Sequence, residues 1–261
     1  MVGYDIVSER FDLSNRVVII TGAGQGIGRA FAQAFAAAGA IPVIAELKAD
    51  AGESVAEGIR ETGAQALAVA TDVGDEQSTL ALAAVVQERF GRIDGLINNA
   101  GIFSTIKMRS FSEIPLAEWN QIMHVNVTGV FLMTRAVAPM MKKQRFGRII
   151  NISSAAVTMG RSGYLHYIAS KSALLGMSRS LAHELGGDGV TVNSLLPGAT
   201  DTEVERATVS PEQRKAMLAM RSVSRAETPE DLVGTALFLA SPDSAFLTGQ
   251  SLTVDGGLTH L

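Results

Sequence analysis

The sequence contains no cysteine, and this absence removes several kinds of chemistry at once. Disulfide bonds, thiolate metal ligands and a cysteine nucleophile are excluded, and the composition fits a reducing compartment. The four histidines, at positions 124, 166, 183 and 260, do not have the spacing of a helical zinc motif. We therefore expect no metal site and a cytoplasmic protein.

Charge and long apolar runs are also scarce. Only 18% of the residues are charged, and the formal net charge is −4. Nucleic acids and anionic membranes both attract a local excess of lysine and arginine, so neither is an expected partner. Glycine or proline interrupts each apolar run before the roughly 18 residues of a membrane span, and residues 1–15 have no apolar signal segment. A small molecule is the expected partner.

Apolar residues, in contrast, are abundant: 47% of the 261 residues are hydrophobic, enough for one large core. Short apolar segments alternate with stretches of helical periodicity, such as residues 28–39 and 78–91. Strands that are apolar on both faces are typical of a parallel sheet between two helix layers. The pattern predicts one α/β domain over residues 1–261, a doubly wound Rossmann fold with a mostly parallel seven-stranded sheet. The expected strands are residues 16–21, 41–46, 66–72, 95–100, 147–153, 190–196 and 250–255.

Two segments fall outside this alternation. Residues 1–12 precede the first expected strand and are interpreted as an N-terminal extension. Residues 199–225 are charged, contain methionines and are interrupted by Pro211. The second segment has two interpretations, a solvated helical excursion or a lid over the substrate.

A glycine-rich turn links the first expected strand to the helix that follows it. It reads TGAGQGIG over residues 21–28, with glycines at 22, 26 and 28. Glycines let a phosphate approach the backbone, and the start of the helix offers free N–H groups and positive dipole. Glu46 ends the second expected strand about 20 residues later, where a carboxylate accepts hydrogen bonds from an adenosine ribose. Together these features predict a dinucleotide site.

The same residues favour NAD over NADP as the cofactor. The Glu46 carboxylate would repel a 2′-phosphate, and the turn supplies Gln25 where a basic side chain would compensate for that phosphate. Arg29 lies further along the helix. Lys48, two residues beyond Glu46, keeps the NADP alternative open because its ammonium is in reach of a phosphate.

Further motifs follow in order along nearly the whole chain, from Val17 to Gly257. They are DV at 72–73, NNAG at 98–101, HVNVTG with Asn126, NISS ending at Ser154, YIASK at 167–171 and LLPGATDT at 195–202. This set resembles the short-chain dehydrogenase/reductase family of nicotinamide-dependent oxidoreductases. Within that family the chain is most similar to phenylethanol-dehydrogenase-like and levodione-reductase-like members.

The resemblance implies two sets of site residues. The expected catalytic residues are Asn126, Ser154, Tyr167 and Lys171. The expected cofactor-binding residues are Gly22, Gln25, Gly26, Ile27, Gly28, Glu46, Asp72, Val73, Asn99, Ala100, Gly101, Tyr167, Lys171, Pro197, Gly198, Ala199 and Thr202. Asp72 and Val73 are expected at the adenine, and Ala199 and Thr202 at the nicotinamide carboxamide. The asparagine that Asn126 matches holds, through its backbone, a water that links the lysine to solvent.

Interconversion of an alcohol and a ketone needs a group that removes the hydroxyl proton and returns it in the reverse direction. A free tyrosine, with a pKa of about 10, is too weak a base at neutral pH. Lys171 lies one helical turn beyond Tyr167, so its ammonium favours the phenolate. The neighbouring Tyr164 has Ile168 at the equivalent position. Ser154, at a strand end, is expected to hydrogen-bond the substrate oxygen.

Residues 155–166 join the expected serine to the expected catalytic helix and therefore pass beside the substrate. The candidate substrate contacts are Ser154, Val157, Tyr164 and His166. Because Arg161 is the only fixed charge in this segment, its lining favours a compact apolar ketone or secondary alcohol, aromatic or alicyclic. Ile102 and Phe103 belong to the core or border the substrate.

Three further expectations follow from the resemblance and its alternatives. The resemblance implies a homotetramer, formed through the helices that carry Asn126 and Tyr167 and through the C-terminal strand. A 3-oxoacyl-[acyl-carrier-protein] reductase that uses NADPH is the alternative enzyme, since the basic residues 141–148 would suit an acidic carrier. The other interpretation of residues 141–148 is a solvated helix end before the fifth strand. A nicotinamide-binding regulator without turnover is the alternative from another class.

Overall fold

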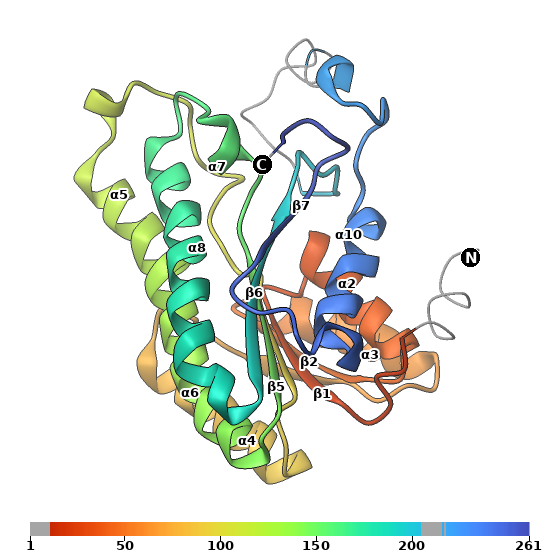
Figure 1. Ribbon diagram of the computed structural model, residues 1–261. Helices are drawn as coiled ribbons and strands as arrows, with labels where there is room; N and C mark the ends of the chain where they lie inside the picture. Colours follow the sequence, from red (N-terminus) through yellow and green to blue (C-terminus); the bar gives the residue numbers. More distant parts are fainter. Residues whose placement is uncertain (1–10, 205–215, 217, 261) are drawn as a thin grey trace.

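A seven-stranded sheet runs through the part of the chain that the structure describes, residues 11–204, 216 and 218–260 of a computed structural model (Figure 1). Its order is β3-β2-β1-β4-β5-β6-β7, and each neighbouring pair is parallel. The strands are β1 (Val17–Thr21), β2 (Ile41–Glu46), β3 (Leu67–Ala70), β4 (Gly95–Asn98), β5 (Gly147–Ile152), β6 (Val190–Pro197) and β7 (Ser251–Val254). The expected strands and the doubly wound α/β fold are confirmed.

Helices cover both faces of this sheet. One layer consists of α2 (Gly26–Ala37), α3 (Ala49–Glu61) and α10 (Pro229–Ala240), and the other of α4 (Glu76–Phe90), α6 (Gly129–Gln144) and α8 (Leu165–Leu185) (Figure 1). The shorter helical segments are η1 (Phe111–Glu113), α5 (Leu116–Met123), η2 (His124–Thr128), α7 (Ala156–Met159), η3 (Gly186–Asp188) and η4 (Pro242–Ser244). Gly91 ends α4 in the left-handed conformation, with φ of 68°, which glycine adopts without steric cost.

The alternation of side chains along β1 explains why its sequence is apolar throughout. Val18 and Ile20 pack with Phe31 and Phe35 of α2, whereas Val17 and Ile19 pack into the cluster on the other face. Successive residues of a strand point to opposite faces, so a strand between two helix layers has no polar side.

The chain reverses its direction of winding at β1, which lies between β2 and β4. In such sheets the carboxyl ends of the two strands on either side of the reversal leave a crevice that binds ligands. Asn99, just beyond β4, ties this crevice together because its Nδ2 donates to the carbonyl oxygens of Thr21 and Gly22, both at 3.0 Å. The glycine-rich turn is therefore fixed to the end of β4.

Two glycines of that turn are required by close packing. Gly22 has φ of 62°, and a Cβ there would lie 2.8 Å from Cα of Ala100. A Cβ on Gly28 would lie 2.4 Å from the Gly22 carbonyl oxygen and 2.6 Å from Nδ2 of Asn99. Gly28 thus lets α2 start directly against the turn.

The two irregular segments are described only in part. Residues 1–10, 205–215, 217 and 261 lie outside the described residues, so the N-terminal extension and the lid expected at 199–225 are not tested over those positions. Phe11 packs against the core cluster beside α2. Within the described ranges, no helix combines the length and apolar character that crossing a membrane demands.

Replacing Gly28 by alanine is expected to damage the turn. The added methyl group would force the Gly22 carbonyl and Asn99 apart, lowering the free energy of unfolding by about 1–3 kcal/mol and weakening dinucleotide binding. Gly58→Ala is the matched control, since no atom lies within 4 Å of its Cβ position in α3. That change should stabilise the protein by about 0.5–1 kcal/mol. Urea unfolding of both variants checks the pair, and equal behaviour would contradict the packing argument.

Candidate active site

Two cavities meet at the carboxyl edge of the sheet. The larger, of about 690 Å³, extends from the glycine-rich turn past Glu46 and Asp72 to residues 99–105. The smaller, of about 180 Å³, is lined by Ser154, Tyr167 and Lys171 and by apolar side chains. Ile27, Asn99, Gly101, Ile102 and Phe103 border both cavities. The arrangement is a long groove with a small chamber at one end.

The larger cavity carries most of the residues expected to bind a dinucleotide. Gly22, Gln25, Gly26, Ile27, Glu46, Asp72, Val73, Asn99, Ala100, Gly101 and Thr202 line it. Glu46 Oε2 accepts the N–H of Gly24 at 3.0 Å, and its Oε1 accepts the N–H of Lys48 at 3.2 Å. The carboxylate is therefore held at the end of β2, next to the turn. Gly28 lies beneath the turn and lines neither cavity.

These residues fit an elongated nucleotide with phosphates at its centre. The turn presents backbone N–H groups where α2 begins, and its glycines leave the space that a Cβ would fill. Glu46 offers a carboxylate to a ribose diol at one end, and the chamber with Tyr167 lies at the other. Within the described ranges, no group of three or more histidine, aspartate or glutamate side chains could hold a metal ion.

Tyr167 and Lys171 occupy the same face of α8 and both line the chamber. Lys171 is 5% exposed, and its Nζ donates to the carbonyl oxygen of Ile152 at 2.8 Å. Burial lowers the pKa of the Lys171 ammonium to about 8. The Tyr167 ring lies 4.6 Å from the ring of Phe103, centroid to centroid. Phe103 thus both borders the chamber and belongs to its small apolar cluster.

Asn126 lies behind this pair, in the single π-helical turn η2 between α5 and α6. Its Oδ1 accepts the Ile102 N–H at 2.7 Å, and its Nδ2 donates to the Ile102 carbonyl at 3.2 Å and to the Ser170 hydroxyl at 3.1 Å. A Cβ on Gly101 would lie 3.2 Å from Asn126 Oδ1 and 3.3 Å from Lys171 Nζ. The asparagine, the lysine and the segment after β4 are therefore packed together.

Two adjacent serines at the end of β5 have separate roles. Ser154 lines the chamber, and its Oγ accepts the N–H of Ala156 at 3.2 Å. Ser153 is buried and donates to the carbonyl oxygen of Lys171 at 2.8 Å, so it ties β5 to α8. The structure thus brings all four expected catalytic residues to one edge of the sheet.

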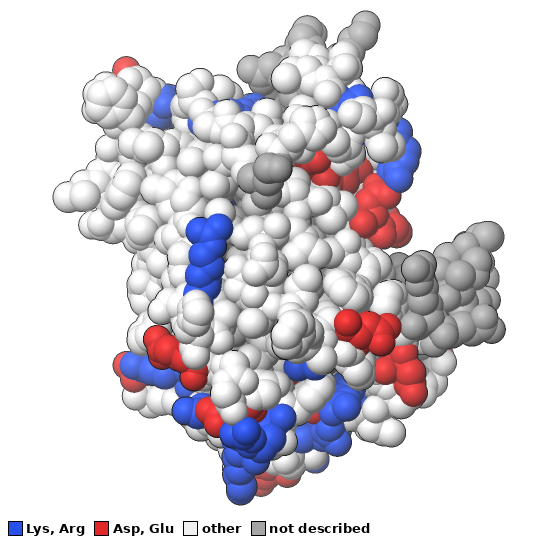
Figure 2. Space-filling view, in the orientation of Figure 1, with Lys and Arg blue, Asp and Glu red and all other residues white. Residues whose placement is uncertain are grey.

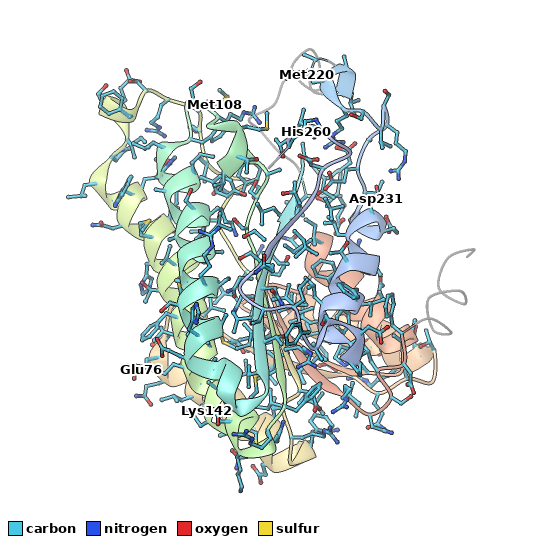
Figure 3. The ribbon with its side chains drawn as sticks, viewed as in Figure 1. Glu76, Met108, Lys142, Met220, Asp231 and His260 are labelled. Atoms are coloured by element: carbon cyan, nitrogen blue, oxygen red, sulfur yellow. The ribbon has the colours of Figure 1, made fainter. Side chains whose placement is uncertain are left out.

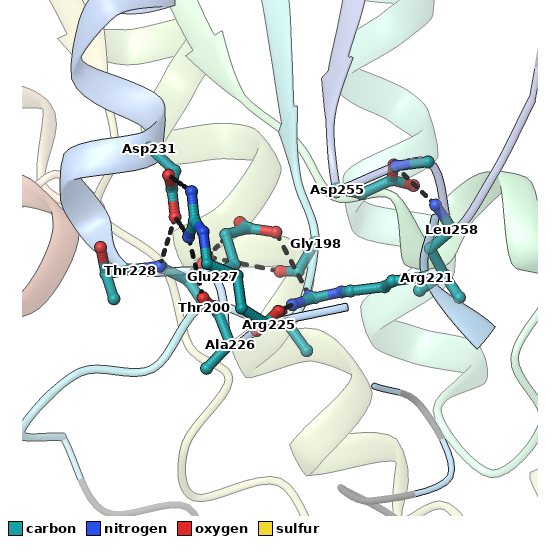
Figure 4. Close-up of polar contacts among 12 residues, drawn as sticks. Gly198, Thr200, Arg221, Arg225, Ala226, Glu227, Thr228, Asp231, Asp255 and Leu258 are labelled. Carbon is teal, nitrogen blue, oxygen red and sulfur yellow. Dashed lines mark hydrogen bonds and ion pairs between the residues drawn. The ribbon is translucent and has the colours of Figure 1, made fainter. Parts of the chain in front are cut away.

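The loop after β6 forms the wall of the chamber with Pro197, Gly198 and Ala199, three residues expected to hold the cofactor. A buried acid supports this loop from below (Figure 4). Glu227 Oε1 accepts the Thr200 hydroxyl at 2.7 Å, and its Oε2 lies 3.3 Å from Arg221. Burial raises the pKa of the Glu227 carboxyl, although the Thr200 hydrogen bond and the Arg221 charge oppose that rise. The sequence did not reveal this support, because Arg221 and Glu227 lie outside the motif at 195–202.

The segment after β7 folds back over the same chamber. Asp255 accepts backbone N–H groups from Gly257 at 3.0 Å, Leu258 at 3.1 Å and Thr259 at 2.9 Å (Figure 4). This turn brings Leu258 into the chamber wall. Asp-Gly-Gly is a recognisable turn signal, but the sequence does not reveal that the turn lies over the site. Figure 3 shows Met108 and His260 at this end of the molecule, opposite Glu76 and Lys142.

The expected substrate contacts divide into two groups. Ser154 and Tyr164 line the chamber, together with Ala156, Met159 and Arg161 of the segment expected beside the substrate and with Ile168 of α8. Val157 and His166 are not among the lining residues.

His166 is placed differently from the prediction because it faces α5. Its ring is fully buried, and Nε2 lies 2.9 Å from Oε1 of Glu118, whose Oε2 lies 3.1 Å from Arg109. Neighbouring residues of a helix point about 100° apart. Tyr167 lines the chamber, and His166 lies on the side of α8 that faces α5.

Comparisons with known proteins agree with this geometry. A family model described as Enoyl-(Acyl carrier protein) reductase matches residues 22–259. The chain is 37% identical over 248 residues to 3-oxoacyl-[acyl-carrier-protein] reductase FabG of Vibrio cholerae, covering 95% of this chain and 98% of the relative. It is 36% identical over 250 residues to 7alpha-hydroxysteroid dehydrogenase of Escherichia coli, covering 96% of each.

A solved structure from Beutenbergia cavernae is similar over the same range. It is provisionally described as an NAD(P)-dependent gluconate 5-dehydrogenase with NADP bound at low occupancy. The TM-score is 0.88 at 37% identity, covering 95% of this chain and 98% of the other. The fold and the site therefore define a nicotinamide-dependent oxidoreductase of the Rossmann type. The chain belongs to the short-chain dehydrogenase/reductase family.

Replacing Lys171 by methionine is expected to stabilise the protein at pH 7 by about 1–2 kcal/mol, because a buried ammonium is costly. The pKa of Lys171 is about 8 in the folded protein and near 10.5 in the unfolded chain. Between these values the unfolded chain binds more protons, so the contribution of Lys171 to stability rises with pH. The advantage of the variant should therefore shrink between pH 8 and 10.5.

Urea unfolding at pH 7 and pH 10 measures this difference. Lys143→Met, on the exposed end of α6, removes a lysine without a burial cost and should show no such pH dependence. A Lys171→Met variant that is less stable than the wild type at pH 7 would contradict the prediction.

Proposed function

We propose that the protein is an NAD-dependent oxidoreductase that interconverts a compact apolar secondary alcohol and its ketone. The observation that carries the proposal is the pair of Tyr167 and Lys171 beside an apolar chamber, with the lysine ammonium buried. Ser154 lines the same chamber at the end of β5.

Tyr167 acts as the general acid and base in this proposal. When bound, a nicotinamide coenzyme supplies the hydride acceptor or donor. Tyr167 removes the hydroxyl proton of the alcohol, and in the reverse direction donates it to the ketone oxygen. The Lys171 ammonium lowers the free energy of the phenolate, since opposite charges attract each other more strongly near a buried group than in bulk water. Ser154 donates a hydrogen bond to the substrate oxygen as negative charge develops.

Asn126 completes the proton path in this proposal. Its side chain is occupied by Ile102 and Ser170, which leaves its backbone for the water that the family resemblance implies. Asn126 lies in a π-helical turn, where the backbone hydrogen bonds of the helix are shifted locally. Such a turn suits a backbone carbonyl that accepts a hydrogen bond from the proposed water.

The preference for NAD rests on Glu46, which lines the larger cavity at the end of β2. A carboxylate at that position suits a ribose diol and repels a 2′-phosphate. The NADP reported in the structure from Beutenbergia cavernae supports the alternative cofactor.

The substrate class rests on the lining of the small chamber. Its volume of about 180 Å³ and its apolar walls suit a compact aromatic or alicyclic group. The guanidinium carbon of Arg161 lies 5.1 Å from the centre of the Tyr164 ring, so this charge is directed along the chamber wall.

A 3-oxoacyl-[acyl-carrier-protein] reductase that uses NADPH is the second candidate. The relative from Vibrio cholerae carries that name, which favours this candidate directly. The basic residues 141–148 do not support it, because they lie at the amino end of β5, about 20 Å or one strand length from the chamber. Lys142 and Arg145 both pair with Asp188 there, and Figure 2 shows the basic side chains gathered at the lower end of the molecule. A carrier would have to bind at the opposite end.

Two further properties belong to the proposal. We expect a homotetramer formed through the helices that carry Asn126 and Tyr167, as the family resemblance implies, and a cytoplasmic location. Size measurement in solution tests the first of these.

Tyr167→Phe should lower kcat at least about a hundredfold, the usual scale of a general acid or base. The ring is retained, so the Kd for NADH should not change. Tyr164→Phe is the matched control, because it removes a phenol hydroxyl from the same chamber while leaving Tyr167 and Lys171 in place. Its kcat should remain within about tenfold of the wild type, since its phenol has no role in proton transfer. Full turnover by Tyr167→Phe would remove Tyr167 from the mechanism.

The assay for these variants uses a panel with both NADH and NADPH. The panel contains compact aromatic and alicyclic ketones and 3-oxoacyl thioesters. Reduction of the ketones supports the first candidate, and turnover of the thioesters alone supports the second. Absence of turnover with intact binding of the cofactor would favour a regulator.

Glu46→Ala should weaken NADH binding about tenfold, because a charged acceptor for the ribose is lost, and should improve binding of NADPH. Asp50→Ala is the control, since it removes an exposed carboxylate from the first turn of α3 close by. The ratio of kcat/KM for NADH to that for NADPH is the measurement. An unchanged ratio would show that Glu46 does not select the cofactor.

A further inference from the structure

A carboxylate already occupies the start of α2 in this structure. Glu203, from the loop after β6, accepts the N–H of Gly26 through Oε1 at 2.8 Å. The same oxygen lies 3.0 Å from the guanidinium of Arg29. Val204 and Thr202 carry carbon atoms 3.4 and 3.8 Å from the position that a Cβ on Gly26 would take. The loop after β6 therefore packs directly on the glycine-rich turn.

The contact coincides with the place where the dinucleotide diphosphate is expected. Gly26 begins α2, so its N–H is one of the free donors at the positive end of the helix. The N-terminal end of α2 attracts anions. While a carboxylate oxygen accepts the Gly26 N–H, a phosphate oxygen cannot accept a hydrogen bond from the same group.

Glu203 is an anion suited to this competition. Partial burial acts to raise the pKa of its carboxyl, but the Gly26 N–H, the backbone N–H of Glu203 itself and Arg29 together bring the pKa below its ordinary value. The side chain is about half exposed and belongs to a loop, so it can leave without opening the core.

We propose that Glu203 is an intramolecular competitor of the coenzyme diphosphate, holding Gly26 and Arg29 in the free protein and leaving them when the dinucleotide binds. The inference rests on the proposed function only in that the competing anion is the diphosphate of a nicotinamide dinucleotide. Thr202 precedes Glu203 in the chain and is expected to bind the nicotinamide carboxamide. Release of Glu203 therefore couples binding of the diphosphate to the position of the loop that contacts the nicotinamide. Release also frees Arg29 to face the diphosphate.

Glu203→Gln tests the proposal, since glutamine keeps the size of the side chain and removes its charge. The variant should bind NADH about three- to tenfold more tightly than the wild type, because a weaker competitor replaces a charged one. ADP-ribose, which retains the diphosphate, should show the same gain. Adenosine, which has no phosphate, should bind both proteins equally. Titration calorimetry measures all three ligands.

Glu88→Gln is the matched control for the loss of one negative charge. Glu88 is exposed on α4, away from the glycine-rich turn, so its replacement should change none of the three affinities. Equal or weaker NADH binding by Glu203→Gln would overturn the proposal, and so would an equal gain for adenosine. Failure of every protein, wild type included, to bind NADH and ADP-ribose would instead overturn the proposed cofactor and the inference with it.

A crystal structure of the wild type with ADP-ribose gives a second readout that needs no variant. The Glu203 carboxylate should lie beyond hydrogen-bonding distance of the Gly26 N–H, with a phosphate oxygen in its place. A Glu203 that kept its 2.8 Å contact in that complex would contradict the proposal.

Discussion

Lys171 carries an ammonium group into the protein at the carboxyl edge of the sheet, and much of the site is arranged around it. A buried charge is costly unless polar groups surround it, and Ile152 provides a carbonyl oxygen at 2.8 Å. The glycine at position 101 leaves room for the Nζ atom, because a Cβ there would lie 3.3 Å from it. Ser153 holds the backbone of Lys171, so β5 and α8 are joined at the point where the charge lies. In the proposed mechanism, the positive charge of this lysine favours the phenolate of Tyr167.

Carboxylates that accept backbone N–H groups organise the loops around the site. Glu46 accepts from Gly24, Asp255 accepts from three residues of the final turn, and Glu203 accepts from Gly26. Glu227 differs, because it is buried with Arg221 and Thr200 beneath the loop after β6. Loops cannot be stabilised by strand pairing, so such side-chain acceptors fix their backbones instead. Glu203 differs from the other carboxylates because the Gly26 N–H that it holds is the donor proposed for a phosphate oxygen.

The small chamber is closed by segments that lie far apart in the sequence. Phe103 comes from the loop after β4, Met159 from α7 and Leu258 from the turn after β7. Their apolar surfaces surround the polar group at Tyr167, which is the usual composition of a small-molecule site. In the proposed function, these peripheral segments contact the substrate, whereas Ser154, Tyr167 and Lys171 carry out the proton transfer.

The fold followed from the sequence because its determinants are local. Seven apolar segments of strand length, the periodicity of residues 28–39 and 78–91, and the glycine at 91 each act over a few residues. The position of Ser154 at the carboxyl edge followed too, since parallel strands bring their ends to one edge. The sequence did not reveal that His166 turns toward Glu118, because the helix partners of that residue are 48 positions away.

What the amino-acid sequence determined by itself is therefore the order of the elements and the identity of the residues at the strand ends. Tertiary structure alone decided that Leu258 closes the chamber, that Glu227 supports the loop after β6 and that Glu203 reaches Gly26 from 177 residues away. These contacts depend on how distant loops pack at one edge of the sheet, and no local propensity specifies such packing.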